Sequence, residues 1–330
     1  MGRISYLRKI IPGMNIQLVT PAPLRLNNGN KITALRWAQI LKRLGHRVRI
    51  TQTYDGKPCD LLIALHARRS ADSIRTFRDA HPQSPLIVAL TGTDLYRDIR
   101  TNGKAQQSLK LADRLIVLQK MALQELPRAL QAKTQVIYQS AEPLETPAAA
   151  KRKRFHVCVI AHLRAEKDPL RAAMAVRHLP RESRIEVVHI GLALDDRLAT
   201  KALSETARNP RYRWLGALPH RRTRQLLAQS DLACITSKME GSSNVLSEAL
   251  ASGVPVLATK IPGLIGTLGE KFPGYFPVGG TEQLRDLLRR AEINDKFYRS
   301  LKQHCAGVAK FIQPKRELNA WQRLLKELDY

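Results

Sequence analysis

The sequence predicts an α/β protein built from two doubly wound parallel sheets that face each other. Three observations support this expectation. The length of 330 residues suits two domains better than one. Short apolar segments alternate with segments of helical periodicity along most of the chain. One segment rich in proline and then in charge, residues 142–154, interrupts this alternation near the middle of the chain.

The first predicted domain, residues 14–143, opens with a Rossmann-like strand, loop, helix and strand. Its expected strands lie at 14–19, 46–50, 60–65, 85–90, 114–118 and 134–138, with helices near 35–44 and at 70–80. The loop after the first strand lacks the Gly-x-Gly-x-x-Gly pattern, and no acidic residue ends the second strand. The sequence therefore argues against a dinucleotide site here.

Ligands of doubly wound sheets bind at the loops that follow the carboxyl ends of the strands. In the first domain these loops carry glycine and polar residues, which we expect to form one side of a ligand site. The candidates are Gly29, Asn30, Thr33, His66, Thr91, Gly92, Thr93 and Asp94. A histidine at a strand end is as often structural as it is ligand-facing, so both roles stay open for His66.

The second predicted domain, residues 155–307, follows a linker at 144–154. Its expected strands lie at 155–160, 184–190, 213–216, 231–236 and 254–258, with helices starting near 169 and at 281–291. The last segment, 308–330, contains an amphipathic helix at 316–328 whose apolar stripe must dock on another surface. A basic extension at 1–13 precedes the first domain, and its apolar part is too short for a signal peptide.

Residues 231–259 are the most informative part of the chain. An apolar strand leads into the turn 240–244, a helix follows, and Gly253 ends that helix before a second strand. The free N–H groups at the start of the helix predict a site for an anion, above all a phosphate. Glu240 and Glu248 flank this site and suit a ligand that also carries hydroxyl groups. The alternative is an ordinary βαβ unit with a solvated Glu248.

Arg164 and Lys167 follow the first strand of the second domain, three residues apart. We expect both to point into the same cleft as the turn from Gly241 to Asn244. Cations beside a helix N-terminus stabilise the charge that develops on a leaving diphosphate. The alternative is that both are surface charges.

Composition narrows the choice of partners. The chain has 55 basic and 28 acidic residues, a net charge of +27, which attracts polyanions. The basic residues are spread along the chain with few aromatic residues between them, so nucleic-acid binding is not expected, whereas weak association with an anionic membrane stays open. The four cysteines lack metal-ligand spacing and fit a reducing cytoplasm. Asp195 and Asp196 suit a helix cap better than a metal site, so neither a metal nor a cofactor is expected.

The spacings Arg164-x2-Lys167 and Glu240-x7-Glu248, around a Gly-Ser-Ser-Asn turn, resemble the donor site of retaining GT-B glycosyltransferases of family 4. The resemblance covers nearly the whole chain. It implies that the Arg and Lys hold the donor diphosphate, the first glutamate and the turn contact the sugar, and the second glutamate holds the ribose. The donor-binding set it implies is Arg164, Lys167, Leu218, Glu240, Gly241, Ser242, Ser243, Asn244 and Glu248. It also implies that the final helix crosses back to the first domain.

The first domain resembles the selenosugar synthase subfamily of selenoneine biosynthesis. The matching segments are Thr20-Pro-Ala-Pro23, 29–37, Leu44-Gly-His-Arg-Val48 and Thr91-Gly-Thr-Asp-Leu-Tyr96. This resemblance implies transfer of a sugar from UDP-N-acetylglucosamine or UDP-glucose to selenophosphate, with a new carbon–selenium bond. It makes Asn30 and Thr33 catalytic candidates beside Arg164, Lys167 and Glu240, and assigns the candidate loops of this domain to the acceptor.

Other functions fit parts of the sequence. A family 4-type enzyme acting on a carbohydrate or lipid acceptor would share the donor motif. A basic nucleic-acid-binding protein would share the charge, and a non-hydrolysing sugar epimerase would share the two-domain architecture. The family 4-type enzyme would differ from a selenosugar synthase in its acceptor, a carbohydrate or lipid instead of selenophosphate.

Overall fold

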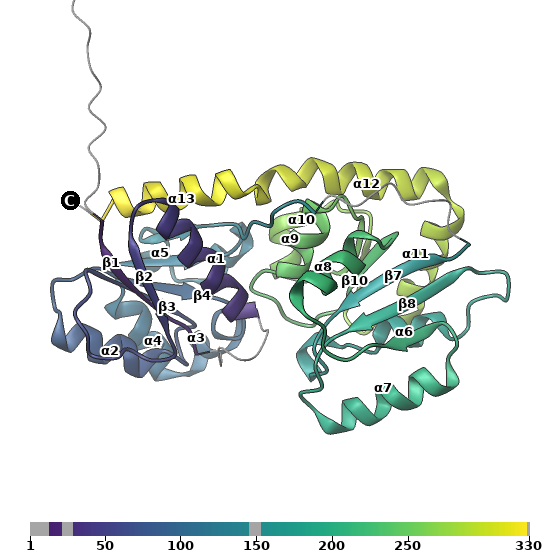
Figure 1. Cartoon of the computed structure of the whole chain (residues 1–330), viewed down its shortest axis with the longest axis horizontal. Coiled ribbons are helices and arrows are strands. Elements are labelled where there is room, and N and C mark those ends of the chain that lie inside the picture. The colour runs from purple at the N-terminus through teal and green to yellow at the C-terminus, as the bar shows by residue number, and fades with distance from the viewer. Residues whose placement is uncertain (1–12, 22–28, 145–152, 329–330) are drawn as a thin grey trace, which may run out of the picture.

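The computed structural model describes residues 13–21, 29–144 and 153–328. These residues form two α/β domains that lie side by side, with a pair of long helices running along one side of both (Figure 1). Most of the predicted basic extension and most of the predicted linker lie outside the described residues, at 1–12 and 145–152. Within the described part of the chain, no helix is long and apolar enough to cross a membrane.

The N-terminal domain contains a six-stranded parallel sheet with the order β2-β1-β3-β4-β5-β6. Its strands are β1 Asn15–Val19, β2 Arg47–Thr51, β3 Leu61–Leu65, β4 Leu86–Leu90, β5 Arg114–Val117 and β6 Thr134–Val136. Every residue of β3 and β4 is buried, because both faces of these central, wholly apolar strands are covered. The six strands predicted from the sequence are therefore confirmed, to within two residues at each end.

The helical segments of this domain are α1 Gly29–Arg43, α2 Ala71–Ala80, η1 Asp94–Asp98, α3 Ile99–Thr101, α4 Gly103–Leu111, η2 Lys120–Glu125 and α5 Arg128–Gln131. Helix α1 begins six residues before the periodic apolar pattern that predicted it. Helix α4 was not predicted, although Asn102 caps it by accepting a hydrogen bond from the backbone N–H of Ala105 at 3.0 Å.

The C-terminal domain contains a second six-stranded parallel sheet, with the order β12-β11-β10-β7-β8-β9. Its strands are β7 Phe155–Ile160, β8 Ile185–Ile190, β9 Tyr212–Trp214, β10 Leu232–Ile235, β11 Val256–Thr259 and β12 Tyr275–Phe276. Its helical segments are η3 Ala165–Lys167, α6 Arg171–Val176, α7 Asp196–Arg208, α8 His220–Ala228, α9 Asn244–Ala251, α10 Pro262–Leu268, α11 Thr281–Ile293 and α12 Asp295–Ala309. Five of the six strands were predicted, and β12 was not. Asp195 caps α7, as expected, by accepting from the N–H of Leu198 at 3.0 Å.

The end of the chain returns to the N-terminal domain. Helix α12 packs on the C-terminal core, the short η4 Lys310–Ile312 follows, and α13 Pro314–Lys326 runs along the N-terminal domain (Figure 1). Trp321 of α13 is fully buried and meets Trp37 of α1 edge to face, with ring centroids 4.9 Å apart. Because truncating a buried tryptophan costs about 3–5 kcal/mol, this contact holds α13 firmly to the N-terminal domain.

Candidate functional site

The turn between β10 and α9 lies at the carboxyl edge of the C-terminal sheet. Its last residue, Ser243, accepts a hydrogen bond from the N–H of Leu246 at 3.3 Å and so caps α9. The chain then passes through α9 into β11, which confirms the predicted order of strand, turn, helix and strand. The first N–H groups of α9 are left facing the turn, where an anion would be stabilised.

Glu240, in the turn, is buried and is held from two sides. Its Oε1 atom accepts hydrogen bonds from Lys167 Nζ and from Ser237 Oγ, the latter at 2.6 Å. The loop that carries Lys167 is fixed to the same turn, because the N–H of Lys238 donates to the carbonyl of Glu166 at 2.8 Å and Thr236 Oγ1 donates to the carbonyl of Lys167 at 2.9 Å. The structure thus brings together two residues that lie 73 positions apart in the sequence.

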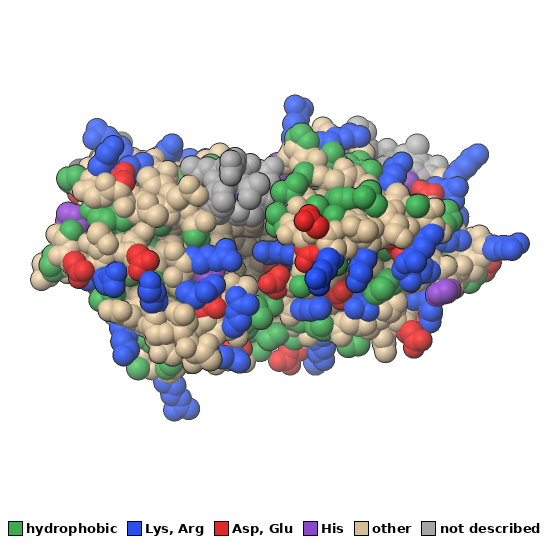
Figure 2. Space-filling model, turned by 90° about the horizontal axis from the view of Figure 1, so that it is seen from below, with side chains coloured by type: hydrophobic (Ala, Val, Ile, Leu, Met, Phe, Trp, Pro, Cys, Tyr) green, Lys and Arg blue, Asp and Glu red, His purple; other side chains and the backbone are tan. Residues whose placement is uncertain are grey.

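Arg164 stands at the start of the same loop, immediately before η3. Its side chain is exposed, and among the described residues it forms no ion pair. Lys and Arg side chains gather on both domains where the domains adjoin (Figure 2). The predicted pair of cations therefore consists of one lysine already bound to a carboxylate and one arginine that is free to meet an anion.

Glu248, in α9, has a partner that the sequence did not suggest. Its Oε1 atom lies 2.8 Å from Nε2 of His220, the first residue of α8. The carboxylate is buried, whereas the side chain of His220 is 50% exposed. Leu218, two residues before His220, packs against the C-terminal core. A lone histidine after a proline, 28 positions from Glu248, gave no signal in the sequence.

The two domains touch at glycines of the turn and of the loop after β4. A Cβ atom on Gly241 would lie 2.5 Å from the carbonyl oxygen of Thr91 and 2.7 Å from the nitrogen of Gly92. Gly263, from α10, approaches the carbonyl oxygen of Glu240 in the same way, so that a Cβ there would lie 1.7 Å from it. Side chains at these positions would push apart the backbone segments that meet at the site.

Asp94 organises the loop after β4. It is fully buried and accepts hydrogen bonds from three backbone N–H groups, those of Thr91 at 3.0 Å, Gly92 at 2.8 Å and Ala67 at 3.0 Å. His66 has a positive φ of 74° and places its Nε2 3.0 Å from Thr93 Oγ1. Burial lowers the pKa of His66 despite the nearby carboxylate of Asp94, so the ring is neutral at pH 7.

The N-terminus of α1 lies beside the N-terminus of α9 at the domain junction. Asn244 Nδ2 donates to the carbonyl of Gly29 at 3.3 Å, and Asn30 follows, half-buried, in the first turn of α1. Thr33 is buried, and its hydroxyl donates to the carbonyl of Gly29 at 2.9 Å and accepts from Gln139 Nε2 at 2.6 Å. Its hydroxyl is thus engaged within the protein, and a role for Thr33 at the acceptor stays a prediction.

Arg36 connects this junction to the final helix, and sequence reasoning missed it. Its Nη1 donates to Asn244 Oδ1 at 2.9 Å, and its Nε donates to Glu317 Oε2 of α13 at 3.0 Å. Glu317 also accepts from Trp37 Nε1 at 2.7 Å and from the N–H of Ser140 at 2.8 Å. The turn at the start of α9 is therefore fastened to α1 and, through Arg36, to α13.

This arrangement suits an extended anionic ligand with hydroxyl groups. One side offers Arg164, Lys167 and the start of α9, the other offers the start of α1, and Glu240 and Glu248 supply hydrogen-bond acceptors. Groups of three or more His, Cys, Asp or Glu side chains that could hold a metal ion do not occur in the part of the chain that the structure describes.

Comparisons with known proteins agree with this architecture. A family model described as "Glycosyl transferases group 1" matches residues 140–305, just over half of the chain. HepE of Anabaena, solved in complex with UDP and glucose, has 16% sequence identity and a TM-score of 0.75 over 95% of this chain and 100% of that chain. Sucrose-phosphate synthase of Thermosynechococcus elongatus has 14% identity and a TM-score of 0.76 over 95% and 98% of the two chains. The predicted GT-B fold, two Rossmann-like domains with parallel sheets, is confirmed.

Proposed function

The chain belongs to the group 1 glycosyl transferases, and we propose that it transfers a sugar from a UDP-sugar to selenophosphate. The donor would be UDP-N-acetylglucosamine or UDP-glucose, and the product would carry a carbon–selenium bond at the anomeric carbon. This is the reaction of the selenosugar synthases that the N-terminal half resembles. We place it in the cytoplasm, where the four free cysteines stay reduced.

A UDP-sugar is the donor that best fits the C-terminal side of the site. HepE, a protein of similar fold, has been solved with UDP and with UDP-glucose. In this chain the diphosphate would lie between Arg164, Lys167 and the first N–H groups of α9. Glu240 would contact the sugar, and Glu248 would accept hydrogen bonds from the ribose hydroxyls. Lys167 carries three N–H donors, so it can donate to the diphosphate as well as to Glu240.

The observation that carries the acceptor proposal is the meeting of two helix N-termini at the domain junction. Asn244 at the start of α9 bonds to the carbonyl of Gly29 at the start of α1, so the positive ends of both helices lie close together. A donor diphosphate needs only one of them. The other suits a small oxyanion such as selenophosphate, bound by the N–H groups of Gly29 and Asn30.

The transfer step needs little help from a base. The selenium atom of selenophosphate would attack the anomeric carbon as the bond from that carbon to the diphosphate oxygen breaks, and UDP would leave with the electron pair. Selenophosphate is already a strong nucleophile, so no side chain has to take a proton from it. The protein would act by positioning both substrates and by stabilising the charge on the leaving diphosphate with Arg164 and Lys167.

Product mass tests this proposal. The chain is incubated with UDP-N-acetylglucosamine or UDP-glucose, with either selenophosphate or a panel of sugar acceptors, and UDP release is measured alongside. We expect a selenium-containing sugar product with selenophosphate alone, and a loss of activity at limiting donor in Glu248→Ala. Transfer to a sugar acceptor with no selenium product would instead indicate a carbohydrate-acceptor enzyme.

A further inference from the structure

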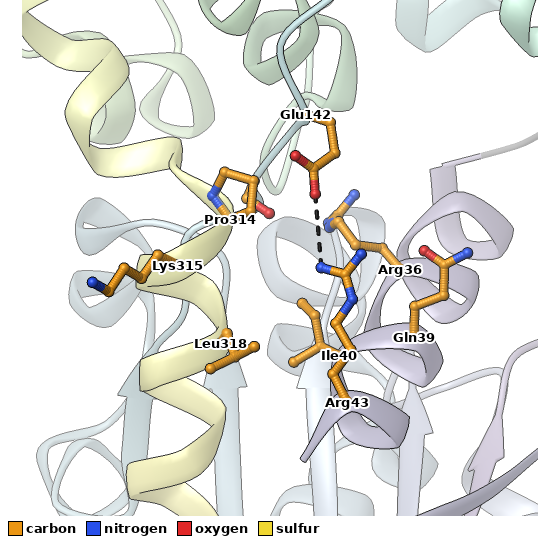
Figure 3. Close-up of a pocket in the computed structure, with 9 residues that line it drawn as sticks. Arg36, Gln39, Ile40, Arg43, Glu142, Pro314, Lys315 and Leu318 are labelled. Carbon is orange, nitrogen blue, oxygen red and sulfur yellow. Dashed lines mark ion pairs between the residues drawn. The ribbon is translucent and has the colours of Figure 1, made fainter. Parts of the chain in front are cut away.

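A pocket of about 400 Å³ lies where α1, α13 and the segment that leaves the N-terminal domain meet (Figure 3). This volume is within the range of small-molecule sites. One wall is a single face of α1, because Arg36, Gln39, Ile40 and Arg43 recur at helical spacing. The opposite wall is the first turns of α13, where Leu318 approaches Ile40. Neither the donor glutamates nor the loop after β4 contributes to this pocket.

The charge of the pocket is positive. Arg36 and Arg43 line it from α1, and Lys315 is the basic lining residue of α13, with its side chain directed away from the two arginines (Figure 3). Glu142 is the single acidic residue among the lining residues. It pairs with Arg43 at 3.8 Å, but both side chains are more than 60% exposed, so the pair is weak and exchangeable.

Arg36 has a donor group without a partner. Its Nε bonds to Glu317 and its Nη1 to Asn244, whereas its buried Nη2 has no hydrogen-bond partner among the described residues. A buried unpaired donor is rare in folded proteins and points to a missing partner. Because this atom exposes almost no surface, a ligand oxygen beside Arg36 reaches it only when the guanidinium turns toward the pocket.

Helix α13 adds a second anion-stabilising feature on the facing wall. Its capping position, Gln313, makes no side-chain hydrogen bond to the helix, and Pro314 occupies the first turn. The positive end of a helix of 13 residues is thus uncapped by its own side chain beside the pocket. Ile40, Pro314 and Leu318 supply an apolar surface, and the polar residues Gln39 and Ser140 complete the lining.

We propose that this pocket binds a small phosphate-bearing molecule with a compact apolar part. Its phosphate lies between Arg36, Arg43 and the start of α13, and its apolar part rests on Ile40 and Leu318. The predicted donor and acceptor residues do not line this pocket, although Arg36 bonds to Asn244 of the donor set, and the proposal does not depend on the identity of the sugar acceptor.

The test is calorimetric titration of the full chain with inorganic phosphate and with phenyl phosphate. Phosphate can also bind at the helix N-termini of the domain junction. The test therefore compares the affinity of each pocket variant with that of the parent chain. Arg43→Glu should weaken binding of phenyl phosphate at least tenfold. The control is Lys42→Glu, which makes the same charge change at the adjacent, exposed residue outside the pocket and should leave the affinity within twofold.

Glu142→Gln should act in the opposite direction. It removes the one carboxylate that lines the pocket and releases Arg43, so phenyl phosphate should bind several-fold more tightly, which a folding defect cannot imitate. Phenyl phosphate should also bind more tightly than inorganic phosphate because of the apolar wall. The proposal is overturned if Arg43→Glu binds phenyl phosphate like the parent chain, if Glu142→Gln gains no affinity, or if both probes bind equally.

Discussion

The donor and acceptor sides of the domain junction use their side chains differently. We define the donor side as Arg164, Lys167, the turn 240–244 and Glu248, and the acceptor side as 29–33, His66 and 91–94. On the donor side, both carboxylates are paired with side chains that a ligand can replace, Glu240 with Lys167 and Glu248 with His220. On the acceptor side, the side chains of Asp94 and Thr33 form hydrogen bonds with backbone groups of the protein and hold these segments in place.

We therefore expect the donor side to bind its ligand through side chains and the acceptor side to bind its ligand mainly through backbone N–H groups. The donor side offers charged groups that a nucleotide sugar would contact directly. The acceptor side offers mainly N–H groups at the start of α1 and a loop that Asp94 fixes. Substitutions on the donor side should therefore change kinetics more than stability, and the reverse should hold for the buried residues of the acceptor side.

Arg164→Ala should give the largest kinetic effect. Arg164 is exposed and forms no ion pair among the described residues, so its loss should leave the fold intact. Removing one group that stabilises the leaving diphosphate should lower kcat roughly 100- to 1000-fold, about 3–4 kcal/mol. The readout is the steady-state rate of UDP release at saturating donor, with the melting temperature as the control. A kcat close to that of the parent would remove Arg164 from the proposed role.

The pH dependence of stability should reveal the buried His189 of the donor domain. Its Nε2 bonds to the carbonyl of Ala161 at 2.8 Å and its Nδ1 to the Tyr212 hydroxyl at 2.7 Å, and burial lowers its pKa to about 4. Between about pH 6.5 and 4 the unfolded chain binds this proton and the folded chain does not. Stability should therefore fall as the pH drops through this window, by up to about 3 kcal/mol from this residue. Denaturant unfolding at pH 7 and pH 4.5 measures the loss, which should be smaller in His189→Gln.

Asp94→Asn should lower stability and leave donor binding unchanged. The carboxylate accepts three backbone N–H groups in a fully buried position, and an amide cannot accept with both ends. We expect a loss of about 2 kcal/mol in the free energy of unfolding. The KM for the UDP-sugar should stay within about twofold at a temperature where the variant is folded. If Asp94→Asn keeps the stability of the parent chain and raises the KM for the UDP-sugar, Asp94 acts on donor binding and the expected difference between the two sides is wrong.

His220→Ala should have a smaller effect, confined to the donor. His220 orients the carboxylate of Glu248 without being buried itself, so its loss should raise the KM for the UDP-sugar several-fold, about 1 kcal/mol, with kcat unchanged. His220→Gln, which can still donate a hydrogen bond, should restore much of the affinity. If the alanine variant lowers kcat and leaves KM unchanged, His220 does not act through donor binding.

Much of the fold could be predicted because most strands are short apolar segments bounded by polar turns. The whole N-terminal sheet, and β10, α9 and β11 around the turn 240–244, follow from local patterns. Strand β12 escaped prediction because it consists of two residues, Tyr275 and Phe276, and forms only by pairing with β11. Helix α8 escaped because its sequence is mostly polar and charged, with four of nine residues basic or histidine at its start.

The site was predictable where ligand-binding groups follow strands, and unpredictable where partners come from distant segments. Lys167 was expected to point into the same cleft as the turn 241–244, and the structure bonds it to Glu240, the residue just before that turn. Arg36 and His220 carried no local signal, because their roles depend on contacts 208 and 28 residues away. The engagement of Thr33 by Gln139 likewise depends on a segment 106 residues later, so the sequence could not show that its hydroxyl is taken.

The most direct test of the account is the kinetic behaviour of Asn30→Asp. An aspartate in the first turn of α1 stabilises the helix through its dipole, so the variant should fold at least as well as the parent chain. If a small oxyanion binds at this helix start, the added charge should repel it and raise the KM for selenophosphate at least tenfold, with a smaller change in the KM for the UDP-sugar. A KM for selenophosphate equal to that of the parent would contradict the account.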